Sequence, residues 1–398
     1  MQQRSTFSYF QSISIGIAIF TMFFGAGNLV SPIIIGTSSG THMFAGLVGF
    51  LVTAVCLPLV GLIAMILFDG NYDAFFERLG GQHAKNIAIF IAMLIIGPVI
   101  AIPRIVTLSH VMMAPFLPWS FLQSINIWSS AVFAGIFLGI TYLATYKETG
   151  IITLLGVIIG PIKVASLLFI IIKGCYQISL IPFFSTMQFG GFTAFKQGLI
   201  EGFGTLDLLG AIFFSAMIIH LLRQRKDQHL SRAQMTILGF QASFIGAALL
   251  AFFYTGLTLL GFLYGQGLDL KSGELFREIA FKVMGTSGAI VIALAVVMAC
   301  LSTSIALTAV FAEYLQQILP VRLSFGKALA LGILLCVPLS CFGLDHVRSI
   351  AGGPIILIGY PVLIVLTFCN IAYKWFGFRL VRIPVLVTFI IMVLNYLR

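Results

Sequence analysis

The chain has 398 residues, of which 60% are hydrophobic and only 9% are charged, and its formal net charge is +10. Because an ordinary soluble domain carries about 25% charged residues, this composition excludes a soluble protein and indicates a polytopic membrane protein. The strands of a membrane β-barrel would need short alternating segments, whereas these apolar runs are continuous, which favours helices and predicts an all-α fold.

Hydropathy predicts about eleven transmembrane helices, each long enough to cross a bilayer at about 1.5 Å of rise per residue. Lys and Arg are more numerous in the loops on the side that holds residues 223–232, which predicts a cytoplasmic N-terminus. These basic residues are scattered, so the net charge does not indicate a nucleic-acid partner. The expected spans are residues 10–36, 42–68, 86–116, 124–145, 150–173, 203–221, 232–264, 287–318, 324–343, 350–372 and 380–397.

The first span is interrupted at its centre. Residues 20–32 read Phe-Thr-Met-Phe-Phe-Gly-Ala-Gly-Asn-Leu-Val-Ser-Pro. Glycine weakens a helix and proline removes a backbone donor, and an unpaired backbone group in hydrocarbon costs several kcal/mol, so such a break persists only beside a protein-lined or wet cavity. We interpret it as a place where backbone groups serve as ligands. The alternative is a packing notch made by small residues.

Two basic residues lie inside the spans, where each ionisable group costs at least about 2.5–3.5 kcal/mol to insert. Arg104 follows two prolines in the third span, and we expect it to pair with an acid or to cap a kink. Lys163 follows a Gly-Pro pair at mid-depth in the fifth span. We interpret Lys163 as a positive charge that faces the central cavity, with snorkelling to the interface as the alternative.

The sixth span is interrupted in the same way as the first. Residues 198–210 read Gly-Leu-Ile-Glu-Gly-Phe-Gly-Thr-Leu-Asp-Leu-Leu-Gly, with Asp207 among the glycines. The two breaks are five spans apart, and because five is odd, two halves of five spans would face opposite ways across the membrane. Interrupted helices at corresponding positions of inverted halves point to the binding site of a transporter. Asp207 is expected to bind a cation, carry a proton or hold freed backbone groups.

The eighth span contains adjacent hydroxyls at Ser302 and Thr303. Hydroxyl oxygens are hard ligands that suit a small cation, although in membrane helices they also bond to carbonyls of their own helix. Residues 265–286, just before this span, predict a short amphipathic helix over the outer face, which would be either a gate or an inert surface helix.

The remaining polar residues of the spans form no catalytic or metal-binding pattern. His110 and His220 are lone histidines, which are expected to be satisfied core or interface residues. Glu313 is expected to form an ion pair at the interface or at a gate. The six cysteines lie in or beside apolar runs without metal-ligand spacing.

These stretches together resemble the bacterial branched-chain amino acid:cation symporters. Residues 23–28, Phe-Phe-Gly-Ala-Gly-Asn, resemble the first-helix signature of that family, and residues 204–210 resemble its sixth-helix break. Stretches at 97–104, 161–163 and 299–313 look similar to the family in the same order. The resemblance covers nearly the whole chain. It implies the inverted-repeat architecture of the amino acid–polyamine–cation superfamily, with helices one and six unwound at the centre.

The resemblance implies a substrate site between the two breaks. The substrate carboxylate would meet N–H groups around Ala26 and Gly27, at the positive end of the half-helix that follows. The ammonium would meet carbonyls of residues 203–205, and neighbouring phenylalanines would surround a Leu, Ile or Val side chain. The implied substrate-binding residues are Phe23, Ala26, Gly27, Phe203, Gly204 and Thr205.

By similarity with sodium-coupled members of the superfamily, one cation site would combine carbonyls of the first break with hydroxyls of the eighth span. Asn28 would serve a second cation site. Some proton-coupled relatives place a lysine of the fifth helix where the sodium would sit, and Lys163 in that position would replace the ion. Sodium is the coupling ion expected here, and the proton is the alternative. The implied ion-binding or coupling residues are Thr21, Phe24, Asn28, Ser302, Thr303, Asp207 and Lys163.

The sequence therefore predicts an all-α polytopic membrane protein of about eleven transmembrane helices, built as a 5+5 inverted repeat with broken helices one and six. The expected parts are a first half (1–173), an outer connecting loop (174–202), a second half (203–372) and a peripheral eleventh helix (373–398). It would import branched-chain amino acids by sodium symport with alternating access.

Three alternatives to this function remain open. One is a carrier for another small neutral or cationic solute, and another is a channel, although a channel would need a continuous polar pore ring. The third is a membrane-embedded enzyme using Asp207 or His220, but a nucleotide loop, a metal cluster and a nucleophile–base pair are all missing from the sequence. We therefore expect no enzyme activity and no cofactor. The expected partners are the amino acid and membrane lipid, without nucleic acid or an obligatory protein partner.

Overall fold

The computed structural model describes residues 2–146, 160–177, 190–224, 232–320, 323–353 and 355–397. Every secondary-structure element in these ranges is a helix, which confirms the all-α prediction. Seven helical segments are long and apolar enough to cross a membrane, and the bent pair Phe325–Ser340 and Leu344–Ile350 would make an eighth. Two shorter apolar helices are Ser12–Phe23 and Arg382–Leu397.

The first half of the described chain begins with a broken helix. Helix α1 ends at Phe23, and α2 starts again at Ala26, so the first span breaks where the glycines predict. The helices of this half are α1 (Gln2–Phe23), α2 (Ala26–Ser39), α3 (Met43–Leu51), α4 (Leu57–Leu67), α5 (Tyr72–Phe76), α6 (Gln82–Leu94), α7 (Ala101–Met113), α8 (Ser120–Gln123), α9 (Ile127–Thr145) and α11 (Gly160–Tyr176). Short 3₁₀ or π turns at 40–42, 52–56, 77–79, 95–99 and 114–116 join several of them.

The second half also begins with a broken helix, but that helix starts earlier than predicted. Residues 191–203, expected in the outer loop 174–202, form α12, so the sixth span begins at Gly191 and not at residue 203. The helices are α12 (Gly191–Phe203), α13 (Asp207–Gln224), α14 (Arg232–Tyr264), α15 (Ser272–Ile318), α16 (Phe325–Ser340), α17 (Leu344–Gly352), α18 (Tyr360–Phe376) and α19 (Arg382–Leu397), with a π turn at 355–359.

Helix α15 is bent near its start. Gly285 has φ +67° and ψ 179°, which separates Ser272–Met284 from the long apolar part. A side chain would be strained at this positive φ. The separated segment is the short helix predicted between residues 265 and 286.

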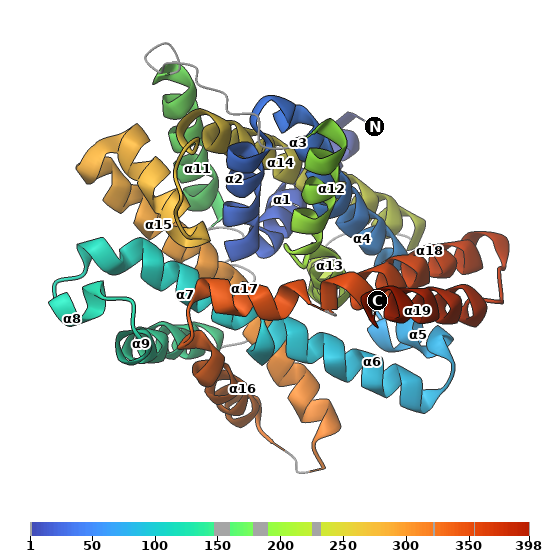
Figure 1. Cartoon of the computed structure of the whole chain (residues 1–398). Helices are drawn as coiled ribbons and strands as arrows, with labels where there is room; N and C mark the ends of the chain where they lie inside the picture. The colour runs from blue at the N-terminus through green and yellow to red at the C-terminus, as the bar shows by residue number, and fades with distance from the viewer. Residues whose placement is uncertain are drawn as a thin grey trace.

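The two halves pack reciprocally around the broken helices. The helix after the sixth span, α14, packs on α1 and α2, and the helices after the first span, α3 and α4, pack on α12 and α13. The third span of each half also contacts the other, since α7 of the first half packs on α15 of the second. Figure 1 shows α1, α2, α12 and α13 near the centre, with α18 and α19 to one side. Such exchanged contacts are those expected of an inverted repeat.

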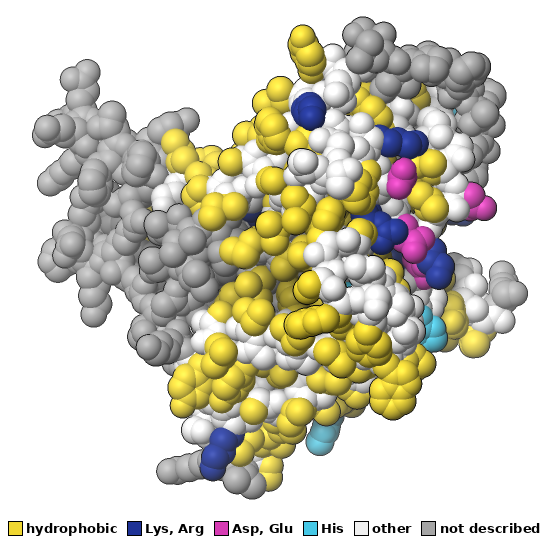
Figure 2. Space-filling view, turned by 90° about the vertical axis from the view of Figure 1, so that its left-hand side faces the viewer, with side chains coloured by type: hydrophobic (Ala, Val, Ile, Leu, Met, Phe, Trp, Pro, Cys, Tyr) yellow, Lys and Arg dark blue, Asp and Glu magenta, His cyan; other side chains and the backbone are white. Residues whose placement is uncertain are grey.

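The outside of the molecule suits a bilayer. Large apolar side chains are exposed along several helices, among them Phe90, Ile136, Leu143, Leu334 and Phe389. Figure 2 shows many hydrophobic side chains on one face, with most of its charged side chains toward the right of the view. An apolar exposed surface of this extent indicates contact with lipid.

Glycines allow the broken helices to approach their partners closely. A Cβ atom added at Gly198 of α12 would lie 2.0 Å from the Gly46 carbonyl oxygen of α3, and one at Gly36 of α2 would lie 2.0 Å from the Thr258 carbonyl oxygen of α14. These are backbone atoms, which cannot turn aside. Small residues therefore bring the helix backbones together in both halves.

We expect Gly198→Val to destabilise the protein, because the added side chain would force α12 away from α3. Overpacking of this kind typically costs about 1–3 kcal/mol. Thermal unfolding of the purified protein in detergent measures the effect. Gly135→Val is the matched control, since no heavy atom lies within 4 Å of a Cβ placed at Gly135 in α9. Equal melting temperatures for the two variants would contradict the close-packing argument.

Candidate functional site

Asn28 closes the first break and links it to the second. Its Oδ1 accepts a hydrogen bond from the Gly25 N–H at 3.1 Å, which satisfies a backbone donor that the broken helix leaves free. Its Nδ2 donates to Asp207 Oδ2 at 2.6 Å and also to the Tyr254 hydroxyl. Since Asp207 opens α13, one amide group joins the two broken helices.

Asp207 and Tyr254 complete this buried cluster. The Tyr254 hydroxyl, carried by α14, donates to Asp207 Oδ2 at 3.0 Å. The side chains of Asn28, Asp207 and Tyr254 are all buried, with exposures of 1%, 4% and 0%. Sequence reasoning identified Asn28 and Asp207 but missed Tyr254. The available signal was a phenol inside the otherwise apolar stretch of residues 250–254.

The second break depends on a residue in an unusual backbone conformation. Leu206, between α12 and α13, has φ +65° and is buried. A non-glycine residue with positive φ is uncommon and persists where surrounding contacts hold it. Leu206 N–H bonds to the Phe203 carbonyl, and Thr205 N–H bonds to the Gly202 carbonyl. The chain thus turns tightly and exposes the next carbonyls toward the first break.

Arg104 donates hydrogen bonds to those exposed carbonyls. Its Nη1 donates to the Gly204 carbonyl oxygen, and its Nη2 donates to the Thr205 carbonyl oxygen at 3.2 Å. A Cβ added at Gly27 would lie 2.7 Å from Nη2, so the guanidinium also lies against the first break. Arg104 was expected to cap a kink or to pair with an acid. Instead, its side chain reaches from α7 to both breaks and donates to backbone carbonyls of the second.

The Arg104 side chain lines two small cavities. One, of about 30 Å³, is lined by residues that include Phe23, Ala26, Thr205 and Phe214. The other, of about 90 Å³, is lined by residues that include Ala26, Gly27 and Gly204. Of the implied substrate-binding residues, only Phe203 is not among the residues that line these two cavities. Its ring packs on that of Tyr360, with 5.4 Å between the ring centroids.

The residues implied for the cation site gather around Lys163. Its Nζ donates to the Thr21 carbonyl oxygen at 2.9 Å and to Ser302 Oγ at 3.3 Å, and the side chain is fully buried. It also lies 5.5 Å from the centre of the Phe24 ring. Thr303, the residue after Ser302, donates its hydroxyl to the Ala299 carbonyl. The structure therefore brings the α1, α11 and α15 residues together with an ammonium among them.

An ion pair also lines the 90 Å³ cavity. Glu201 of α12 and Arg348 of α17 approach to 2.9 Å, and both residues line the 90 Å³ cavity together with Arg104. Sequence reasoning missed this pair, which connects helices that are 147 residues apart in the chain. The pair bridges α12 to α17 beside the site.

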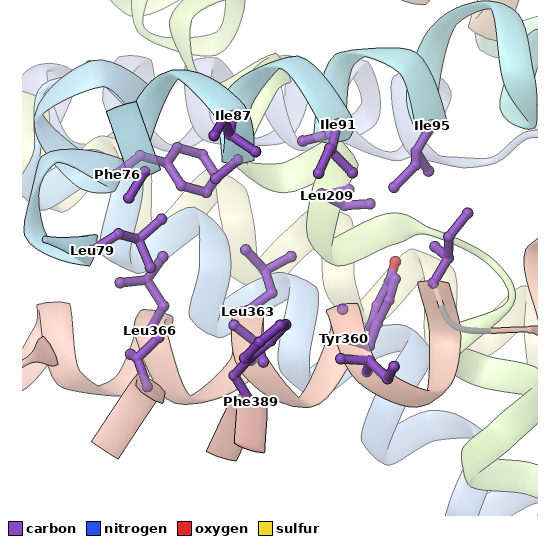
Figure 3. Close-up of a pocket in the computed structure, with 18 of the residues that line it drawn as sticks. Phe76, Leu79, Ile87, Ile91, Ile95, Leu209, Tyr360, Leu363, Leu366 and Phe389 are labelled. Atoms are coloured by element: carbon purple, nitrogen blue, oxygen red, sulfur yellow. The ribbon is translucent and has the colours of Figure 1, made fainter. Parts of the chain in front are cut away.

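A larger, mostly apolar groove lies away from the two breaks. It has a volume of about 640 Å³ and runs between α6, α18 and α19, and Tyr360 and Arg382 are the polar side chains in its lining. Figure 3 shows Ile87, Ile91 and Ile95 on one wall, opposite Leu363 and Phe389. An amino-acid zwitterion needs convergent polar groups, so this groove is not its site.

Other polar residues have roles away from the breaks. His110 lies near Ser130 Oγ and the Leu122 carbonyl and stacks on Phe133 at 4.6 Å, as expected for a satisfied core histidine. Glu313 is exposed, and the His220 side chain lies outside the described residues. Within the described ranges, no group of three or more His, Cys, Asp or Glu residues could hold a metal ion.

We expect Tyr254→Phe to lower stability, because Asp207 loses one of its two donors and the Asn28 amide loses an acceptor. An unsatisfied buried polar group typically costs about 1–3 kcal/mol. Thermal unfolding in detergent measures the loss. Tyr142→Phe is the control, since the Tyr142 hydroxyl makes no hydrogen bond with the described residues and its loss should leave the melting temperature nearly unchanged. An unaltered Tyr254→Phe protein would show that the cluster does not hold the breaks together.

Two solved structures share this fold over most of the chain. An inward-facing conformation of Mhp1 aligns with a TM-score of 0.62 at 13% identity, covering 97% of this chain and 90% of the other. MhsT in complex with L-phenylalanine aligns with a TM-score of 0.59 at 15% identity, covering 96% and 98%. At these identities the likeness shows the fold alone.

Sequence comparison shows the family. The branched-chain amino acid permease BraB of Bacillus subtilis is 30% identical over 371 residues, covering 91% of this chain and 81% of that protein. The branched-chain amino acid transport system 3 carrier protein of Pseudomonas aeruginosa is 29% identical over 364 residues, covering 90% and 80%. Residues 8–398 match the family described as branched-chain amino acid transport protein. The chain therefore belongs to the branched-chain amino acid transport protein family.

Proposed function

We propose that this carrier imports leucine, isoleucine and valine across the bacterial inner membrane by proton symport, with alternating access around the two breaks. Membership of the family supports the substrate class. The observation that carries the coupling ion is the position of Lys163 Nζ, on the Thr21 carbonyl and the Ser302 hydroxyl. The N-terminus is cytoplasmic in this proposal.

The proposed substrate site uses backbone groups for the charged ends of the amino acid. The carboxylate is held by N–H groups of Ala26 and Gly27 at the start of α2, where the helix dipole favours negative charge. The ammonium is held by the carbonyls of the second break. Apolar residues that line the smaller cavity, among them Phe23, Phe214 and Leu307, suit a branched aliphatic side chain.

Lys163 competes with sodium for the same oxygens. The resemblance places a sodium ion among the carbonyls near Thr21 and Phe24 and the hydroxyls of Ser302 and Thr303. Two of these groups already bind the ammonium. Two unit charges about 4 Å apart repel by about 4 kcal/mol at an effective dielectric constant near 20, so a sodium ion and a charged Lys163 would not share the position.

A change of protonation at Lys163 supplies the coupling in this proposal. The charged ammonium ties α11 to α1 and α15, because it donates to one group on each helix. Neutral lysine has fewer donors and no charge, so its loss of a proton weakens both links and frees α1 to move. Asp207, held by two donors, joins the breaks throughout the cycle.

Sodium symport, the coupling expected from the sequence, is the second candidate. It is favoured by Thr303, whose hydroxyl oxygen would lie 3.3 Å from a Cβ at Gly25 and is therefore next to the first break. That oxygen and the Ser302 hydroxyl are ligands of a kind that sodium accepts. Imposed ion gradients separate the two candidates.

We expect labelled leucine to accumulate in proteoliposomes when an inward proton gradient is imposed, and not when an inward sodium gradient is imposed alone. Isoleucine and valine should compete with leucine. Accumulation driven by sodium without a proton gradient would reject proton coupling and restore sodium as the driving ion. Liposomes without protein give the background, and absence of accumulation under either gradient would contradict the proposed transport.

We expect Lys163→Ala to abolish proton-driven leucine accumulation and to make leucine binding depend on sodium. The substitution removes the ammonium and leaves the Thr21 carbonyl and Ser302 hydroxyl free for a small cation. Scintillation-proximity binding at zero and at high sodium measures this. Lys173→Ala, on the same helix near its outer end, is the matched control and should behave as the native protein. Sodium-independent binding by Lys163→Ala would count against a cation site at this position.

A further inference from the structure

We propose that the guanidinium of Arg104 occupies the ammonium subsite of the empty carrier, and that a substrate must displace it. Arg104 then selects ligands that carry both an ammonium and a carboxylate. This inference rests on the proposed function and specifies how its site chooses the substrate class. It follows from the hydrogen bonds of Arg104, from the space around its side chain and from the charges of its neighbours.

The carbonyls that would hold the ammonium are already in use. Within the second break, the Gly202 and Phe203 carbonyls accept from the backbone N–H groups of Thr205 and Leu206. The next two carbonyls, of Gly204 and Thr205, accept from Arg104 Nη1 and Nη2. Guanidinium and ammonium are both cationic donors that seek the same oxygens. An incoming ammonium therefore competes with Arg104.

Arg104 also limits the space for the substrate. The side chain lines both the 30 Å³ cavity and the 90 Å³ cavity, and each is far smaller than the roughly 300 Å³ at the lower end of ligand sites. Withdrawal of the guanidinium would join the two cavities. Displacement of Arg104 thus opens the volume and frees the carbonyls in one movement.

The displaced guanidinium needs a new acceptor, because a buried charge without a partner is strongly unfavourable. The neighbouring acids are engaged, with Asp207 bound by Asn28 and Tyr254, and Glu201 paired with Arg348. Nη2 lies close to Gly27, beside the N–H groups proposed for the substrate carboxylate. Arg104 Nε is buried and has no hydrogen-bond partner among the described residues. The carboxylate of the substrate can therefore accept from the guanidinium that its ammonium has displaced.

A zwitterion exchanges one set of contacts for another without leaving a charge unpaired. An amine that lacks the carboxylate would displace Arg104 and leave it without an acceptor. A carboxylic acid that lacks the ammonium would leave Arg104 on the carbonyls and would find too little room. Arg104 therefore rejects both half-molecules, although each resembles leucine in its side chain.

The test compares leucine with its two half-molecules, 3-methylbutan-1-amine and 4-methylpentanoate, by calorimetric binding to the purified full chain. We expect the native protein to bind leucine at least 100-fold more tightly than either half-molecule. In Arg104→Gln, the amine should bind at least tenfold more tightly than to the native protein, while leucine binds at least tenfold more weakly. The amine binds more tightly because the glutamine leaves the carbonyls of the ammonium subsite free. Leucine binds more weakly because its carboxylate loses the guanidinium as a partner.

Two further variants keep the test decisive. Arg104→Lys retains the charge but offers a single point donor, so its amine affinity should lie between those of the native protein and Arg104→Gln; this variant decides the matter if the glutamine protein does not fold. Arg277→Gln is the matched control, because Arg277 also donates to a backbone carbonyl, that of Val111, away from the breaks. It should leave both affinities unchanged.

The outcomes separate this inference from the proposed function. Absence of leucine binding to the native protein would contradict the proposed substrate. Leucine binding by the native protein, with an amine affinity that stays constant or falls in parallel with that of leucine in both Arg104 variants, would overturn the role of Arg104 alone and make it a structural link between helices.

Discussion

Backbone groups freed by a broken helix must find partners inside the protein, because the bilayer core offers none. This constraint organises the centre of the molecule. The Gly25 N–H bonds to Asn28, the Thr21 carbonyl bonds to Lys163, and the carbonyls of the second break bond to Arg104. Side chains from other parts of the chain thus satisfy both breaks.

The scaffold makes this arrangement possible by bringing backbones very close together. Glycines on α2 and α12 allow α14 and α3 to approach without intervening side chains, and the contacts are exchanged between the two halves. The breaks of the first and sixth spans therefore face each other at one place. Asn28, Asp207 and Tyr254 then join three helices through a single carboxylate oxygen.

A small number of charged residues surround the candidate site. Arg104 lines both small cavities, Lys163 lies among α1, α11 and α15, and Asp207 lies beside both breaks. The Glu201–Arg348 pair lies along the cavity beyond Arg104 and links α12 to α17. Each charge has an opposite charge or a set of dipoles near it, as buried ions require. The large groove between α6, α18 and α19 is lined mostly by apolar side chains and is suited to hydrocarbon.

The sequence by itself determined the all-α membrane fold, the two broken spans and the glycine-rich surfaces, because composition and local backbone chemistry decide these. It also indicated Asn28, Asp207 and Lys163 as candidate functional residues, because a polar or charged side chain is costly to place in the bilayer core. The start of the sixth span was placed too late, because α12 is short and carries Lys196 and Glu201, which lower its hydropathy. Only the tertiary structure decided the partners: Arg104 and Gly204 are 100 residues apart, and Asn28 and Tyr254 are 226 apart. Contacts over such separations depend on how whole helices pack, which no local pattern of residues records.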